Sequence, residues 1–399
     1  MMKKNLRLKK QAKILLISLL VILIMGVYFL TREKTMELNG NSEITIYLNE
    51  EYREEGTNIE NCIITSHLDN QKEGTYKIIY EYHDQILERT VHVVDPNRIV
   101  MNLNGDNETY IKLNNPYIES GCHVIDRVEG NMSDKVEITG NVDTSKVGDY
   151  KIIYTIEYNG LVVKKERVVH VVQDFEENTT GIPVLMYHYV YTKDDVPEKL
   201  NVNYILDTDL EKQLKYLTEN NYYFPSYKEL ESYVKGEISL PKKSVILTFD
   251  DGQKGFLKYG IPLLEKYKVP ATSFVIASKN GEKKVEEYAS EYISFQSHSY
   301  NMHRGGGNIG HGGIISVMSK DEIINDLKKS QMIVQNSEAF AYPYGDITDT
   351  ARQAVKETEI ICAFTTQYGK VTKGADLAAL PRVRVVGDNS LESYIESIE

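Results

Sequence analysis

An internal repeat organises the N-terminal half of this chain. Residues 74–80 read GTYKIIY, and residues 148–154 read GDYKIIY. Earlier in each copy IYLNEEY at 46–52 returns as IKLNNPY at 111–117. Self-similarity of this kind predicts two units built on one plan.

Each unit has the pattern of short strands. Tyr and Ile alternate with other residues along 75–80, and the β-branched run TVHVV at 90–94 ends the first copy. Gly, Asn and Asp separate these segments, which is typical of strands joined by tight turns. The pattern predicts two small all-β sandwiches, at residues 35–96 and 97–174.

The G-x-Y-x-I-x-Y strand of both copies resembles the bacterial immunoglobulin-like modules of Gram-positive surface proteins. That resemblance implies a role in spacing or in adhesion to the cell wall. A rigid stalk without a ligand is the simpler interpretation, and both interpretations stay open at this point.

An uncharged run, ILLISLLVILIMGVYFL at residues 14–30, follows a basic N-terminus. A membrane-spanning helix needs about 17–25 apolar residues, and positive charge before such a helix favours a cytoplasmic N-terminus. Residues 1–34 are therefore predicted to be a cytoplasmic tail and a single transmembrane helix in the cell membrane, with the rest of the chain extracellular. The alternative is a cleaved signal peptide, but VYFLTR at 27–32 lacks the small residues of a cleavage site.

The overall charge excludes one class of partner. The formal net charge is −12, whereas nucleic-acid binding depends on clustered Lys and Arg. The three cysteines are too few for a disulfide framework and none lies in a C-x-x-C motif. We therefore expect no nucleic-acid partner; the sequence sets no oligomeric state.

Beyond the polar segment 174–181 the pattern changes to alternating strands and helices. Apolar strands are expected at 184–187 and 244–249, and a helix at 209–219. Ser319 and Glu322 form a capping box that opens a further helix. Such alternation predicts a parallel sheet or barrel, in which functional residues lie at the carboxyl ends of strands.

Two pairs of polar residues follow predicted strands. Asp250 and Asp251 end the run LTF, and adjacent carboxylates repel each other unless a cation or a shared proton offsets the charge. His298 and His303 follow the strand expected at 292–295. Taken alone, the two aspartates could form an ordinary strand-to-turn Asp-Asp-Gly, and the His pair could be incidental. Taken together, the two pairs predict a metal site, because imidazole and carboxylate suit Zn²⁺.

Four motifs in this order point to a family. They are TFDDG at 248–252, SHSYNMH at 297–303, FAYPYG at 340–345 and LPRVRV at 380–385. Residues 182–399 thereby resemble the NodB-type polysaccharide deacetylases, carbohydrate esterase family 4. The resemblance implies an α/β domain with a distorted (β/α) barrel, and a metal-dependent hydrolase that removes N-acetyl groups from cell-surface polysaccharide.

The resemblance also implies a role for individual residues. Asp251, His298 and His303 would hold the metal, with Zn²⁺ first and Co²⁺, Ni²⁺ or Mn²⁺ also suited to this ligand set. Asp250 would be the general base toward the attacking water.

Two further residues complete the implied catalytic set. The backbone N–H of Tyr344 would stabilise the oxyanion. His188 would protonate the departing amine, a task that suits a side chain whose pKa lies near neutrality.

The sequence departs from the family pattern in three places. Ala341 stands where the family has an arginine, so Arg382 or Arg384 is expected to orient Asp250 instead. No tryptophan is present, and no histidine follows His311. These departures leave an alternative function open, a catalytically impaired surface protein that binds cell-wall glycan.

The substrate also stays open. The His spacing and the opening PVLMYHYV at 183–190 resemble the branch that acts on poly-N-acetylglucosamine, whereas an anchored enzyme would face peptidoglycan; chitin fits less well. A zinc peptidase is not supported, since H-E-x-x-H is absent. The glycine-rich stretch 304–313 is expected to be a mobile loop beside the cleft.

Overall fold

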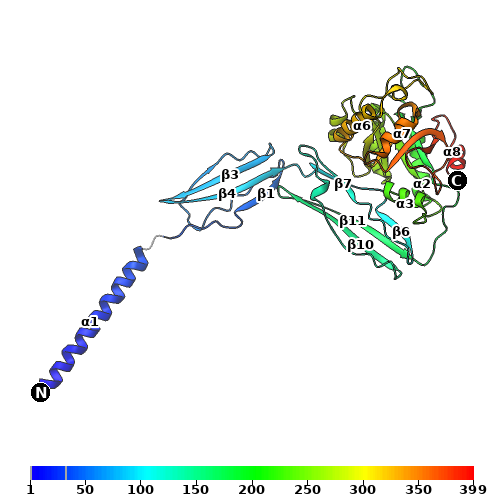
Figure 1. Cartoon of the computed structure of the whole chain (residues 1–399). Coiled ribbons are helices and arrows are strands. Elements are labelled where there is room, and N and C mark those ends of the chain that lie inside the picture. Colours follow the sequence, from blue (N-terminus) through cyan, green and yellow to red (C-terminus); the bar gives the residue numbers. More distant parts are fainter. Residues whose placement is uncertain (1, 32–33) are drawn as a thin grey trace. The chain divides into compact units, whose positions relative to one another are not determined.

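The computed structural model describes residues 2–31 and 34–399. The chain forms two compact units, Met1–Pro96 and Asn97–Glu399. Figure 1 shows the elements of each.

Helix α1 (Met2–Thr31) contains the uncharged run. Its described apolar side chains are exposed, for example Leu16 at 71% and Ile22 at 65%. Among the described residues, no helix is both long and apolar enough to cross a membrane. Residues 1, 32 and 33 of the predicted tail and anchor lie outside the described residues, and the anchor stays a prediction.

The remainder of the first unit is a four-stranded sheet. The strands are β1 (Glu43–Tyr47), β2 (Ile63–Ser66), β3 (Gly74–Tyr82) and β4 (Gln85–Val94), in the order β1-β4-β3-β2. β3 and β4 form an antiparallel hairpin, while β1 pairs with β4 in parallel. Alternate residues such as Ile78, Tyr80 and Val91 are buried, as their period of two requires.

The second β module repeats this sheet. Its strands are β6 (Glu108–Lys112), β9 (Glu137–Thr139), β10 (Gly148–Tyr158) and β11 (Leu161–Val172), in the order β6-β11-β10-β9. The repeat in sequence is therefore a repeat in topology.

The two modules differ in their second layer. In the second module β5 (Ile99–Leu103), β7 (Cys122–Asp126) and β8 (Gly130–Asn131) form a separate three-stranded sheet. In the described part of the first module, the only strand pairing outside the main sheet is the isolated bridge between Leu38 and Thr57.

The C-terminal half is a closed barrel of parallel strands, as predicted. The strands, in barrel order, are β12 (Val184–Tyr187), β15 (Ile246–Phe249), β16 (Ala271–Val275), β17 (Ile293–Ser297), β18 (Ala339–Ala341), β19 (Cys362–Tyr368) and β20 (Leu380–Arg384). A short parallel pair, β13 (Tyr189–Tyr191) and β14 (Tyr204–Leu206), follows β12.

Helices connect the strands of the barrel, and a last helix follows β20. They are α2 (Asp207–Glu219), α3 (Tyr227–Lys235), α4 (Ile261–Tyr267), α5 (Gly281–Glu287), α6 (Lys320–Val334), α7 (Asp349–Lys356) and α8 (Leu391–Ile398), with a π-helical turn at Phe256–Gly260 before α4. Helix α6 begins at the predicted capping box, in which Ser319 and Glu322 bond reciprocally.

The second β module packs on the barrel within one compact unit. Asn102 Nδ2 donates to the Glu291 carbonyl over 2.7 Å, and the Ser120 and Ser226 hydroxyls lie 2.7 Å apart. A small cavity between the two is lined by Ile246 and Ala271, the first residues of β15 and β16. The module therefore covers the amino ends of the barrel strands and leaves the carboxyl ends free.

Candidate active site

The predicted site residues gather at the carboxyl ends of the barrel strands. His188 directly follows β12, Asp250 and Asp251 directly follow β15, and His298 directly follows β17. Since all barrel strands are parallel, these ends meet on one face of the barrel.

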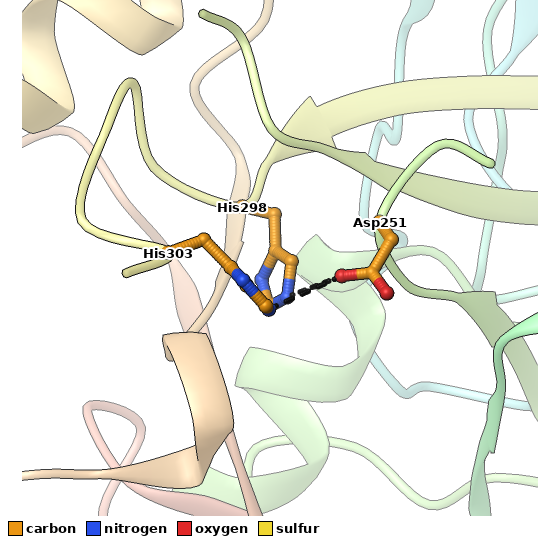
Figure 2. Close-up of side chains that lie close together, drawn as sticks. All are labelled: Asp251, His298 and His303. Atoms are coloured by element: carbon orange, nitrogen blue, oxygen red, sulfur yellow. Dashed lines mark ion pairs between the residues drawn. The ribbon is translucent and has the colours of Figure 1, made fainter. Parts of the chain in front are cut away.

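Three of them converge on one point (Figure 2). Asp251 Oδ1 lies 3.2 Å from His303 Nε2 and 3.5 Å from His298 Nε2. One ligand atom from each residue lies within 4.8 Å of the other two. A single cation can therefore contact all three.

Neighbouring groups fix the orientation of these ligands. The Tyr189 hydroxyl donates to Asp251 Oδ2 over 2.7 Å. His298 Nδ1 lies 2.8 Å from the Ala341 carbonyl, which can only accept, so Nδ1 carries the proton and Nε2 presents its lone pair to the site.

The electrostatics of the site favour positive charge. Burial would raise the pKa of Asp251, but the adjacent His298 and His303 imidazoles hold it far below its usual range. Burial would lower the pKa of His298, yet the adjacent Asp251 and Asp250 raise it. Asp251 Oδ1 is buried and makes no hydrogen bond within the described chain. A buried carboxylate oxygen facing two imidazole nitrogens fits a divalent cation.

Asp250 points to a different partner. Arg382, fully buried in β20, donates to both carboxylate oxygens of Asp250 over 2.8 and 2.7 Å. Burial alone would raise the pKa of Asp250, but the Arg382 guanidinium holds it below its ordinary value. Of the two arginines expected to replace the one missing at Ala341, it is Arg382 that reaches this carboxylate; Arg384 is exposed and bonds Asn203.

The loops at the site hold residues in the left-handed backbone region. Asp251, Ser299 and Tyr344 have φ values of 74°, 73° and 62°. Non-glycine residues pay a conformational cost there, and such positions cluster at functional sites. The Tyr344 ring lies 4.4 Å from that of His303, which places its loop against the metal ligands.

His188 lies close enough to the two aspartates to interact with their charges. Burial lowers its pKa, and this effect outweighs the opposing pull of Asp250 and Asp251. Burial therefore favours the neutral imidazole, and as an acid His188 must first take up a proton.

Two residues that sequence reasoning missed support the site. Tyr189 was not singled out, although it directly follows His188 in the opening motif. Asp346 directly follows the FAYPYG motif, and its carboxylate accepts from the His311 and Gly313 backbone amides over 2.8 and 2.7 Å. It thereby ties the glycine-rich stretch to the motif loop.

A cleft of about 600 Å³ adjoins the ligands. Asp251, His303 and Tyr189 line it together with residues in and around α5. A larger cavity of about 950 Å³ lies between the second β module and α6, and none of the predicted site residues lines it.

Comparison with known proteins finds two family profiles in the chain. The family profile "Polysaccharide deacetylase" matches residues 237–362, and "Bacterial surface protein, Ig-like domain" matches residues 101–171. The latter match confirms the predicted character of the second β module.

The chain covers most of the length of two curated relatives. A poly-beta-1,6-N-acetyl-D-glucosamine N-deacetylase of Staphylococcus epidermidis is 31% identical over 240 residues, 53% of this chain and 81% of the relative. A protein of the same name from Staphylococcus aureus (strain MRSA252) is 28% identical over 211 residues, 48% of this chain and 71% of the relative. Among solved structures, Streptococcus pyogenes deacetylase PplD in complex with acetate is 27% identical, with a TM-score of 0.48, over 55% of this chain and 98% of that one. The chain belongs to the polysaccharide deacetylase family.

Proposed function

We propose that this protein is a metal-dependent N-deacetylase of a cell-surface polysaccharide that contains N-acetylglucosamine. The observation that carries the proposal is the convergence of Asp251, His298 and His303 beside an Asp250 carboxylate held by Arg382. The names of the staphylococcal relatives favour poly-β-1,6-N-acetylglucosamine as the polymer, and peptidoglycan is the second candidate.

Asp251, His298 and His303 would hold the cation, with Zn²⁺ first and Co²⁺, Ni²⁺ or Mn²⁺ as alternatives. When bound, the cation supplies a Lewis acid for the acetamide carbonyl and makes water more acidic at neutral pH. The protein contributes the fixed carboxylate, the two oriented imidazoles and the surrounding shell.

The chain's own groups would move the protons. Asp250, kept ionised by Arg382, accepts a proton from the water that attacks the acetyl carbon. The backbone N–H of Tyr344 donates to the carbonyl oxygen as negative charge develops there. His188, once protonated, gives its proton to the amine as the C–N bond breaks, and acetate and the free amino sugar leave.

The decisive experiment is acetate release by purified residues 35–399. Peptidoglycan and a β-1,6-linked N-acetylglucosamine oligomer are offered in parallel, with and without a chelator, beside Asp250→Asn. Metal-dependent release that Asp250→Asn abolishes would support the proposal and identify the polymer. Metal binding without release from either polymer would overturn it in favour of an impaired glycan-binding protein.

We also propose that the chain is held in the cell membrane by its N-terminal helix, with the catalytic domain outside. The basic residues before the uncharged run and the exposed apolar side chains of α1, such as Leu16, support this assignment. Fractionation of cells that express the full chain, with protease added from outside, tests it. Recovery of the intact protein in the culture medium would contradict the anchor.

A further inference from the structure

The cleft beside the metal ligands has room for more than the acetamide group. Its volume of about 600 Å³ lies in the range of small-molecule sites. Tyr189 and Tyr288 line it together with Asp251 and His303. A sugar whose acetyl group reaches the ligands therefore has neighbouring substituents inside this cleft.

The wall of this cleft is rich in lysine. Lys254, Lys279, Lys283 and Lys284 all line the cleft. The carboxylates among its described lining residues are Asp251 and Glu287. This local excess of cations runs against the charge of the whole chain, which is −12.

Neither carboxylate neutralises the positive charge of all four lysines, because each has partners of its own. Glu287 pairs with Lys283 over 3.4 Å. Asp251 faces the two histidines and accepts from Tyr189.

The other three lysines, Lys254, Lys279 and Lys284, have no ion pair within the described chain. Lys284 is partly buried; burial lowers its pKa, and the nearby charge of Lys279 lowers it further. Ammonium groups crowded on one concave surface repel each other, and a bound anion relieves that repulsion. Flexible lysines acting as point charges are common ligands for phosphate and carboxylate.

We propose that this lysine wall, formed by Lys254, Lys279 and Lys284, binds an anionic group that the polysaccharide carries next to the sugar being deacetylated. The group is a phosphate or a carboxylate. The inference rests on the proposed function and narrows its substrate to an N-acetylglucosamine polymer that carries anionic substituents.

Three soluble oligomers test the proposal. They share one β-1,6-linked N-acetylglucosamine backbone and are unmodified, phosphorylated or O-succinylated. We expect the metal-loaded protein to deacetylate one of the anionic oligomers with a kcat/KM roughly tenfold or more above that of the neutral one, and added salt to reduce this ratio. The better anionic oligomer identifies the group as phosphate or carboxylate.

The double variant Lys279→Gln with Lys284→Gln should bring the anionic-to-neutral ratio close to one. The matched control is Lys164→Gln with Lys373→Gln, which removes two exposed lysines that do not line the cleft. This control should keep the wild-type ratio.

Equal kcat/KM values for all three oligomers, or a ratio unchanged by the double variant, would overturn the lysine wall and leave the deacetylase function standing. Absence of acetate from every oligomer would instead count against the proposed function. Equilibrium binding of the three oligomers then decides the inference. Tighter binding of an anionic oligomer by the wild type than by the double variant supports it, and equal binding refutes it.

Discussion

At the scale of single residues, the general base depends on one arginine. Arg382 is fully buried and holds both oxygens of Asp250, whose side chain is almost fully buried as well. Arg382→Met would leave that carboxylate without a counter-charge. Removing one partner of a buried ion pair costs roughly 3–5 kcal/mol, so we expect a loss of this order in the free energy of unfolding, measured by denaturant titration. We also expect kcat for acetate release to fall at least ~100-fold, as for other lost electrostatic contacts in active sites.

Arg384 provides the matched control for this prediction. It lies two residues along the same strand but is exposed and bonds Asn203. Arg384→Met should change the free energy of unfolding by less than about 0.5 kcal/mol and leave kcat near that of the wild type. Equal losses in the two variants would contradict the assignment of Arg382 to Asp250.

A second prediction concerns the tyrosine that orients a metal ligand. Tyr189→Phe removes the hydroxyl that donates to Asp251 Oδ2 while keeping the ring. Groups that orient ligands typically contribute about 10–100-fold to metal affinity, so we expect Zn²⁺ to bind more weakly by that factor in competition with a chromophoric chelator. Tyr191→Phe, in the same short strand β13, is the control and should bind Zn²⁺ as the wild type does. An unchanged affinity in Tyr189→Phe would show that its hydrogen bond does not position Asp251.

The difference between predicted and missed residues has a physical basis. Asp250, Asp251, His298 and His303 could be predicted because chemically distinctive residues follow apolar strands at short range. Tyr189 could not, because it is one of 29 tyrosines and its role arises only when β13 brings it to Asp251. The left-handed backbone at Tyr344 likewise has no signature in a residue type that rarely adopts it.

At the scale of elements, two capping boxes of the same chemistry lie in different surroundings. Ser319 begins α6 at the surface. Ser226 begins α3 with the same reciprocal bonds to Glu229, but it is buried, and its hydroxyl also contacts Ser120 of the second β module. Loss of a cap alone costs about 1 kcal/mol, and an unsatisfied buried hydroxyl adds about 1–3 kcal/mol.

We therefore expect Ser226→Ala to lower the free energy of unfolding by more than Ser319→Ala does. The expected losses are about 2 kcal/mol or more against about 1 kcal/mol. Denaturant unfolding of the two variants in parallel measures both values. Equal losses would mean that the contact with Ser120 adds nothing to the cap.

The same pair of boxes shows where element prediction succeeded and failed. Ser319 precedes a long helix with clear apolar periodicity. The capping box and the periodicity indicate the same helix start, so α6 could be predicted. The box at Ser226 opens only nine helical residues, Tyr227–Lys235, and the sequence does not predict this helix because a short helix offers little periodicity. The π-helical turn Phe256–Gly260 could not be predicted from periodicity, since its extra residue per turn depends on packing.

At the scale of the whole molecule, the second β module and the barrel belong to one compact unit, Asn97–Glu399. The sequence showed a change of pattern at residues 174–181, which marks where one architecture ends. It could not show that the module packs back on the amino ends of the barrel strands. That contact is made by scattered polar groups, such as Asn102 to the Glu291 carbonyl, which leave no periodic signal.

This contact between module and barrel should make stability depend on pH. Asn104 of the module donates to Glu338 at the base of the barrel over 3.1 Å. Burial raises the pKa of Glu338 from 4.5 to about 7. The folded state therefore binds the Glu338 proton more tightly than the unfolded state does. The stability that this protonated carboxyl contributes is fully present below about pH 4.5 and is lost as the pH rises through about 7.

Replacing this carboxyl by an amide should remove the dependence. Since one pKa unit corresponds to about 1.4 kcal/mol, Glu338→Gln should be more stable than the wild type by up to roughly 3 kcal/mol at pH 8 and about equal to it at pH 4.5. Denaturant unfolding at several pH values measures the difference, and Glu359→Gln, at an exposed carboxylate, is the control that should follow the wild type throughout. A difference that stays constant from pH 4.5 to 8 would mean that Glu338 remains ionised in the folded protein, which would place solvent rather than a sealed contact between the module and the barrel.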